Sequence, residues 1–311
     1  MKTRTIKRAL KAKLDKWAAT ITDAALRKDA RENVIVAGGS IASMLLGEKI
    51  SDFDLYFETA DITERVANYY VARFLELHPD RQETAVGRTE SIKVIRIENR
   101  IKIRVQSKGV ASATEETADY QFFENPSIDE LTIDDYVDQT AGAREAAQEE
   151  KGTFEPVFLT TNAITLTDRI QIVVRFHGTP EEVLKTFDFA HCMNTYRAKD
   201  DSLNLHADAL ECLLVKELRY KGSLYPLCSV IRSRKFIRRG FTCHAGEYLK
   251  MLWQVSELDL TNMEVLEEQL TGVDAAYFYQ LITILKANKE SKGEDFKITS
   301  SYIAEILDRL M

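Results

Sequence analysis

Residues 34–58, VIVAGGSIASMLLGEKISDFDLYFE, constrain the fold more strongly than any other segment of the chain. The segment reads as a buried strand, a glycine turn, a short helix and a second strand. Asp52 and Asp54 stand two residues apart on the second strand, and side chains with that spacing project from one face. Two carboxylates so close together stay ionised comfortably only with a cation between them, so the spacing indicates a divalent-metal site.

Three small residues between the first strand and the helix suit phosphate binding: Gly38, Gly39 and Ser40. Glycine lets the backbone approach a phosphate, while the N-terminus of the helix and the serine hydroxyl offer hydrogen-bond donors. A P-loop is excluded because no Lys-Ser or Lys-Thr follows the glycines, and a dinucleotide fingerprint would need a third glycine and a later acid. The turn therefore predicts a nucleotide site beside the carboxylates.

This order of elements resembles the signature of the DNA polymerase β-like nucleotidyltransferase superfamily, in which a Gly-Gly/Ser turn and a helix precede an Asp-hydrophobic-Asp strand. Residues 162–196 and 220–241 also look like poorly characterised nucleotidyltransferase-like proteins of phages and giant viruses. The resemblance implies an α+β fold whose catalytic core is a mixed sheet with helices. It also implies an NTP substrate and Mg²⁺ or Mn²⁺ as cofactor.

The superfamily places a third acid on a strand of the same sheet, where it holds a second metal and helps to activate the acceptor hydroxyl. In this sequence two positions are candidates for the third acid of the site. Gln171 stands where an acid might be expected, whereas Asp188 lies between two phenylalanines in residues 187–196, which read as a strand. An acid in that setting is hard to explain as a solvated residue, so we predict that Asp188 completes the site. A structural role at a turn, and a degenerate site with Gln171, are the alternatives.

Residues 216–239 hold the densest positive charge in the chain, interleaved with aromatic residues: Lys216, Arg219, Lys221, Arg232, Arg234, Lys235, Arg238 and Arg239. Such a cluster binds phosphate groups. We expect Lys221 and Ser223 to contact the triphosphate, and Arg232, Lys235 and Arg239 to contact phosphate or the acceptor. The alternative is a solvated basic helix face that pairs with the acidic segment 108–153.

Composition narrows the class of protein. The chain has 311 residues, 45% of them hydrophobic and 29% charged, with a net charge of −7, so a nucleic-acid partner must be held by a local basic patch. No apolar run is long enough for a membrane span, and the basic, amphipathic N-terminus lacks the apolar core of a signal peptide. Four cysteines without Cys-x-x-Cys spacing indicate neither a zinc site nor disulfides. A cytoplasmic protein is expected, in the host cytoplasm if a phage encodes it.

Periodicity predicts a three-part chain: an N-terminal helix (1–31), a catalytic core (32–204) with an acidic insertion at about 108–153, and a helical C-terminal domain (205–311). Within the core we expect a helix at 62–77, hairpins at 91–107 and 163–176, and a helix capped by Thr179. After residue 205, further helices are expected, including 275–287 and 301–311.

The expected function is metal-dependent, template-independent transfer of an NMP from an NTP to a hydroxyl acceptor, with release of pyrophosphate. An RNA 3′ end such as that of tRNA is the leading acceptor. A protein or a small molecule is the alternative, and so is a catalytically inactive nucleotidyltransferase fold that serves as a binding module.

Overall fold

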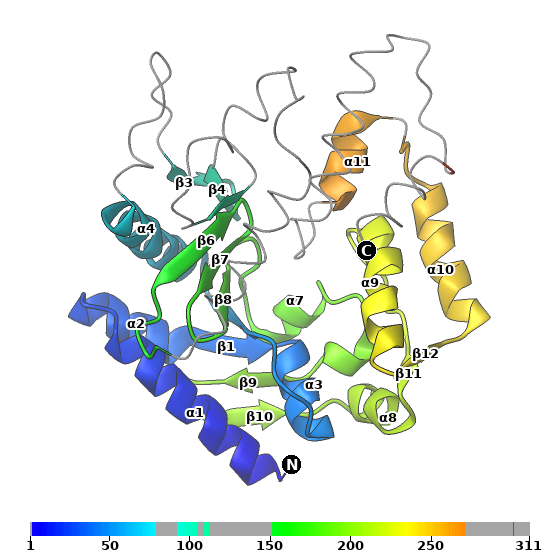
Figure 1. Ribbon diagram of the computed structural model, residues 1–311, viewed down its shortest axis with the longest axis horizontal. Coiled ribbons are helices and arrows are strands. Elements are labelled where there is room, and N and C mark those ends of the chain that lie inside the picture. Colours follow the sequence, from blue (N-terminus) through cyan, green and yellow to red (C-terminus); the bar gives the residue numbers. More distant parts are fainter. Residues whose placement is uncertain are drawn as a thin grey trace.

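The computed structural model describes residues 2–78, 92–104, 109–111, 151–260, 262–270 and 301 (Figure 1). Its helices are α1 (Thr3–Ala19), α2 (Ala24–Asn33), α3 (Gly39–Leu46), α4 (Ala60–Leu77), α7 (Pro180–Leu184), the 3₁₀ turn η2 (Ala190–Cys192), α8 (Ala207–Val215), α9 (Pro226–Arg238), α10 (Ala245–Ser256) and α11 (Met263–Leu270).

The described strands form one large mixed sheet and two small pairs. The eight-stranded sheet has the order β10 (Ser202–Asn204), β9 (Thr195–Arg197), β1 (Val34–Ala37), β2 (Phe53–Phe57), β8 (Ile170–Val173), β7 (Ala163–Leu166), β6 (Pro156–Thr160) and β5 (Gly109–Ala111). Strands β2 and β8 run parallel, whereas the other neighbours in this sheet are antiparallel. The α+β class with a mixed sheet is therefore confirmed.

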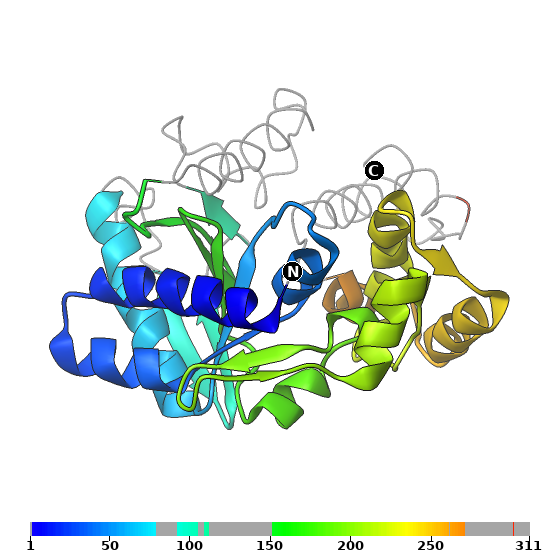
Figure 2. The same cartoon turned by 90° about the horizontal axis from the view of Figure 1, so that it is seen from below.

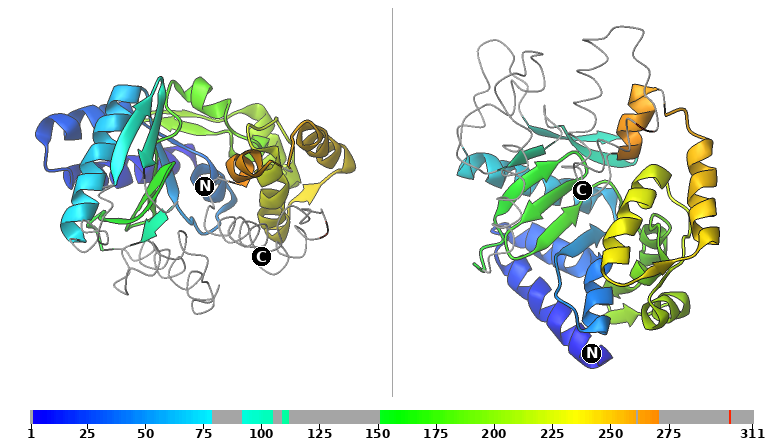
Figure 3. Two further views of the ribbon diagram at one scale, coloured as in Figure 1. Left: turned by 90° about the horizontal axis from the view of Figure 1, so that it is seen from above. Right: turned by 45° about the vertical axis from the view of Figure 1, so that its right-hand side comes forward.

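Helices cover one face of the sheet and close the main core. Trp17 of α1, Phe57 of β2 and Phe74 of α4 are fully buried, and the Trp17 and Phe57 rings lie 6.2 Å apart between centroids. Figures 1 and 2 show α1, α2 and α4 gathered beside the sheet, while α8, α9 and α10 lie together at the other side of the molecule. The right panel of Figure 3 shows α9 between the large sheet and α10.

Local sequence signals account for several elements. The hairpin of β7 and β8 turns at Thr167 and Asp168, as predicted, and Asp168 has a φ of 62°. Helix α7 begins with the predicted cap: the Thr179 hydroxyl accepts from the Glu182 amide at 3.3 Å, and the Glu182 carboxylate accepts from the Thr179 amide at 2.8 Å. The hairpin of β3 (Lys93–Ile97) and β4 (Arg100–Arg104) is also present, as a separate pair.

The prediction of one helix over residues 1–31 is wrong, because the segment is divided. Helix α1 ends at Ala19, and Asp23 starts α2 by accepting a hydrogen bond from the Leu26 amide at 2.9 Å. Asp23 is a good N-cap residue, and the break lets α2 fold back onto α1.

The predicted strand over residues 187–196 is also wrong. Only Thr195–Arg197 forms a strand, and the 3₁₀ turn η2 precedes it. Phe189 makes an isolated bridge with Tyr220, so this part of the chain pairs with the C-terminal segment and not with the sheet. The Phe189 ring packs into an aromatic cluster with Tyr220 and Phe236.

The segment after residue 204 is mostly helical where it is described, with one short parallel pair, β11 (Glu217–Leu218) and β12 (Thr242–Cys243). Most of the acidic insertion, residues 112–150, lies outside the described residues. So do the predicted helix at 275–287 and, apart from residue 301, the predicted helix at 301–311. Within the described chain, no helix is both long and apolar enough to span a membrane.

Candidate active site

The turn after β1 is built around Gly38, whose backbone has a φ of 89°. This conformation favours glycine. A Cβ atom on Gly38 would lie 2.9 Å from Oδ2 of Asp54. Helix α3 begins at Gly39, and the Ser40 hydroxyl in its first turn is buried without a hydrogen bond to any described residue. The glycine turn and the helix N-terminus therefore lie directly against a carboxylate.

We predict that Gly38→Ala lowers both stability and activity. The positive φ would cost about 1–3 kcal/mol, and the new methyl group would displace the Asp54 carboxylate. Gly39→Ala is the matched control, because a Cβ there would meet nothing within 4 Å. Thermal melting should show a lower Tm for Gly38→Ala only, and equal melting of the two variants would contradict the proposed close approach.

Strand β2 presents the acidic pair to a cleft. Asp54 stands opposite Ala37 of β1 and Gln171 of β8, at the centre of the sheet. Asp52 precedes the strand, and its carboxylate accepts a hydrogen bond from Ser51 at 2.9 Å. Both carboxylates line a cavity of about 190 Å³, here called the central cleft, whose other side is formed by α9. The alternation along β2 sends Leu55, which is fully buried, to the opposite face.

Gln171 occupies the position where a third acid was considered. It pairs with Asp54 in the parallel register, lines the central cleft and is only 9% exposed. Its side-chain oxygen is buried and makes no hydrogen bond to any described residue. A neutral amide can supply an oxygen ligand, but it cannot accept a proton from an acceptor hydroxyl.

Asp188 lines the same cleft, yet the prediction that it lies on a neighbouring strand is wrong. Its carboxylate accepts hydrogen bonds from Arg232 at 2.5 Å and from Ser229 at 3.0 Å. Both partners belong to α9, so the aspartate fastens the 187–192 segment to this helix. A buried carboxylate bound by a guanidinium already has a counter-charge in the protein. The contacts favour the structural alternative for Asp188.

We predict that Asp188→Asn lowers stability by about 2–3 kcal/mol, because it removes the charge partner of a partly buried arginine. The transfer activity that the sequence leads us to expect, measured per folded molecule, should remain measurable. Urea denaturation beside an activity assay would check this, with the exposed Asp208→Asn as the control. Complete loss of activity at unchanged stability would instead identify Asp188 as a direct participant.

The residues of segment 216–239 that are predicted to contact phosphate or the acceptor separate into two groups. Ser223, Arg232, Lys235 and Arg239 line the central cleft, so part of the basic segment faces the acidic pair. Lys221 does not: its ammonium group pairs with Asp208 at 3.5 Å, and it lines a different hollow. Its backbone amide is bound to the Asp188 carbonyl, and Gly222, with a φ of 96°, redirects the chain before Ser223. The structure gives no support for Lys221 as a triphosphate ligand.

Glu48 holds two of the cations in place. Arg239 donates to it from Nη2 at 2.5 Å and from Nε at 3.2 Å, and Lys216 approaches at 3.2 Å. The hydrogen bond from Arg239 is the main cause that lowers the pKa of Glu48. The α3–β2 loop is thereby tied to the C-terminal end of α9. Pairing of the basic segment with residues 112–150 lies outside the described chain.

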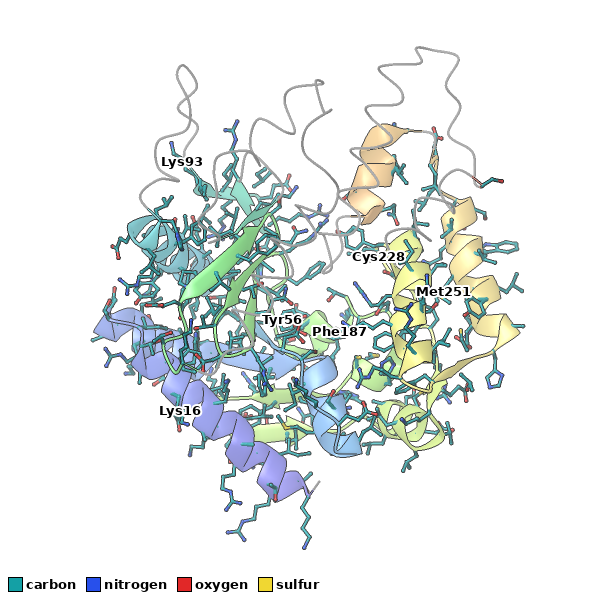
Figure 4. The ribbon with its side chains drawn as sticks, in the orientation of Figure 1. Lys16, Tyr56, Lys93, Phe187, Cys228 and Met251 are labelled. Carbon is teal, nitrogen blue, oxygen red and sulfur yellow. The ribbon has the colours of Figure 1, made fainter. Side chains whose placement is uncertain are left out.

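Other side chains line the cleft without any local sequence signal. The Arg175 guanidinium lies 4.6 Å from the centre of the Tyr225 ring, and both residues face the cleft. Tyr56 of β2 packs against Phe187 with ring centroids 6.1 Å apart (Figure 4). Burial, reinforced by Asp54, raises the pKa of Tyr56, so the phenol is neutral at ordinary pH. Burial likewise raises the pKa of the Cys192 thiol to about 12, which makes it a poor nucleophile.

The donor set fits one magnesium ion better than two. Mg²⁺ is commonly held by one or two carboxylates together with substrate phosphates and water. Asp52 and Asp54, with the Gln171 oxygen beside them, supply that set. Among the described residues, no three His, Cys, Asp or Glu side chains gather closely enough to hold a metal without substrate. The site therefore suits a metal that arrives with the phosphates of a nucleotide.

Comparison with known proteins places the chain in a family. A sequence profile of the Gabija anti-defense 2 family matches residues 8–216. The chain belongs to this family. The matched range contains the glycine turn, Asp52, Asp54, Gln171 and Asp188, whereas α9 with its cleft-lining cations lies beyond it. A relative from Bacillus phage SPbetaL7, "Gabija anti-defense 2", is 23% identical over 138 residues, which are 44% of this chain and 33% of the relative. The chain thus aligns with about a third of that relative.

Solved structures with some likeness include two CCA-adding enzymes. The Thermotoga maritima CCA-adding enzyme complexed with tRNA has a TM-score of 0.38 and 13% identity, covering 94% of this chain and 58% of the enzyme. A CCA-adding enzyme in complex with ATP has a TM-score of 0.39 and 13% identity, covering 94% of this chain and 56% of the enzyme. The chain spans less than two thirds of either enzyme.

Proposed function

We propose that this protein transfers a nucleoside monophosphate from an NTP to a hydroxyl acceptor, and that this activity counteracts Gabija defence. The observation that carries the proposal is the approach of the Gly38 turn to Asp54, at the floor of a cleft with Arg232 and Arg239 opposite. Hydrogen-bond donors for phosphate, an acidic pair and cationic side chains thus converge on one cavity. The family membership supports the anti-defence role, and the site geometry supports the chemistry.

Each part of the cleft has a distinct task in this proposal. The Gly39 and Ser40 amides and the Ser40 hydroxyl donate hydrogen bonds to the terminal phosphates at the start of α3. Asp52 and Asp54 would hold Mg²⁺ or Mn²⁺, which when bound neutralises the triphosphate and the departing pyrophosphate. Arg232, Lys235 and Arg239 add positive charge from α9, and Ser223 adds a hydroxyl. We propose that residues 32–204 form the catalytic core and that the helical region after 205 closes the cleft.

Gln171 limits how the acceptor is activated. An amide can orient the attacking hydroxyl but cannot take its proton. Phosphoryl transfer proceeds largely through positioning and electrostatic stabilisation, so a missing base slows the reaction without forbidding it. We therefore expect a slow transferase. An RNA 3′ end remains the leading acceptor, with a protein hydroxyl as the alternative.

A second candidate function is a catalytically inactive binding module. Two observations favour it: Gln171 stands beside Asp54 in place of an acid, and Asp188 is engaged by Arg232. In that case the fold itself would bind a component of the defence, and the acidic pair would be dispensable.

One experiment tests the proposal and separates these candidates. Cells that carry a Gabija system would express the wild type, Asp52→Asn/Asp54→Asn or the control Asp208→Asn before phage challenge. The proposal predicts loss of protection of the phage only for the acidic-pair variant at equal expression. Full protection by that variant would contradict catalysis and favour the module. Extracts of the same cells, incubated with each labelled NTP, would show which macromolecule takes up the label.

A further inference from the structure

A second hollow lies beside residues 50–53, which also border the central cleft. It has a volume of about 520 Å³ and is called here the basic hollow. Four cations line it around two alanines: Lys13, Lys16, Lys151, Arg169, Ala9 and Ala12. Such a concentration of positive charge is notable in a chain whose net charge is −7.

One face of α1 forms the floor of the basic hollow. Ala9, Ala12, Lys13 and Lys16 recur at intervals of three and four residues and therefore share one side of the helix. The two alanines leave the helix surface open to close approach, and the two lysines flank that opening. Figure 4 shows Lys16 on this helix.

Contacts with neighbouring segments hold two of these cations, Lys13 and Arg169. The Lys13 ammonium lies 5.5 Å from the centre of the Phe53 ring and 5.2 Å from that of Phe154. Arg169 donates from Nη1 to the Ile50 carbonyl at 3.3 Å, which fixes the guanidinium at the rim. Its Nε is buried and makes no hydrogen bond to any described residue.

The acid at the hollow does not cancel this charge. Asp168 is 4% exposed, and its carboxylate accepts hydrogen bonds from the backbone amides of Gly152 at 3.0 Å and Phe154 at 3.5 Å. It braces the loop behind the cations. Among the described residues that line the hollow, four cationic side chains stand beside this one acid, so the described lining favours a polyanion.

The basic hollow adjoins the central cleft. Ile50 and Phe53 line the hollow, whereas Ser51 and Asp52 between them line the cleft. A linear polyanion lying in the hollow therefore has only this short segment to cross before it reaches the acidic pair. A small anion could not extend from the basic hollow into the central cleft, so the adjacency of the two favours a long polyanion.

We propose that the basic hollow binds the phosphodiester backbone of a nucleic-acid strand whose end enters the central cleft. Phe53 and Phe154 are 9% and 3% exposed beneath Lys13, so they offer no face for base stacking. Recognition is then through phosphates and independent of sequence. Only the role of the strand as acceptor rests on the proposed transfer reaction; its binding does not.

Fluorescence anisotropy of a labelled single-stranded RNA of mixed sequence, without NTP, tests the proposal. Lys13→Gln/Lys16→Gln should weaken binding by roughly tenfold at low salt and reduce the slope of log K against log salt by about 1.4, which corresponds to two lost contacts. Lys11→Gln/Lys28→Gln removes the same charge from α1 and α2 outside the hollow, and it should bind as the wild type does.

Several outcomes would overturn the proposal. They are absence of RNA binding by the wild type, equal weakening in both double variants, and displacement of the RNA by inorganic phosphate at the concentration at which unlabelled strand displaces it. The single variant Lys16→Gln keeps the proposal testable if the double variant does not fold, because Lys16 is exposed and makes no contact with the Phe53 and Phe154 rings. It should weaken RNA binding about threefold. Asp54→Asn should bind RNA as the wild type does. If the wild type binds RNA but transfers no nucleotide, or if Asp54→Asn transfers as well as the wild type, the proposed reaction is refuted and this binding site still stands.

Discussion

Asp54→Asn is expected to lower nucleotidyl transfer by a factor of about a thousand or more, because several kcal/mol of charge stabilisation at the triphosphate depends on this carboxylate. The substitution keeps the size of the side chain, so the approach of Gly38 to this position is preserved. The fold should remain intact. Removing one of two neighbouring like charges also relieves repulsion in the metal-free protein, so stability should not fall.

Thermal melting with Mn²⁺ and an NTP provides the companion measurement for Asp54→Asn. A ligand that binds only the folded state raises the Tm, so the wild type should gain stability and the variant should not. Asp52→Asn should behave in the same way, and Asp208→Asn should respond as the wild type does. An equal rise in Tm for the wild type and both acidic-pair variants would contradict the assignment of Asp52 and Asp54 as metal ligands.

Acid should destabilise the protein from near neutrality through His191. This side chain is 1% exposed, and burial, with a smaller effect from Arg239, lowers its pKa from 6.5 to about 3. Its two ring nitrogens make no hydrogen bonds to described residues. Between these pKa values the unfolded chain binds a proton that the folded protein excludes, so stability is full above pH 6.5 and is lost as the pH falls. The free energy of unfolding should drop by about 2 kcal/mol between pH 7 and pH 5.

His191→Phe tests this pH dependence, because the neighbours of the ring, Phe236 and Phe241, are aromatic and apolar. Urea denaturation at pH 7, 6 and 5 should give a shallower decline for the variant than for the wild type. His244→Phe is the control, since that histidine is exposed. Parallel pH profiles for the wild type and His191→Phe would contradict the assignment.

The elements that could be predicted from the sequence are those set by local chemistry. The strand, glycine turn, helix and acidic strand over residues 34–58 depend on neighbours along the chain, and so does the Thr179 cap. What local pattern could not predict depends on distant partners. The role of Asp188 is set by Arg232, 44 residues away, and that of Glu48 by Arg239, 191 residues away.

The error over residues 187–196 has the same origin. Two phenylalanines around an aspartate suggest a core strand, but Phe189 packs against Phe236 of α9, whereas Phe187 packs against Tyr56 of β2 without pairing with the sheet. Lys221 and Arg232 are both predicted to contact phosphate, yet they face different hollows because the chain turns at Gly222. The density of positive charge along the sequence therefore indicates that the basic segment borders the cleft, but it does not indicate which of its side chains line the cleft.

The central claim, that the cleft catalyses nucleotidyl transfer, is tested most directly by following two phosphorus labels. The protein would be incubated with an extract of host cells and an NTP labelled at either the α- or the γ-phosphate. If the cleft transfers an NMP, the α label should appear on a macromolecule and the γ label in pyrophosphate, and both should depend on Asp54. Transfer of the γ label to the acceptor, or no Asp54-dependent transfer of either label, would contradict it.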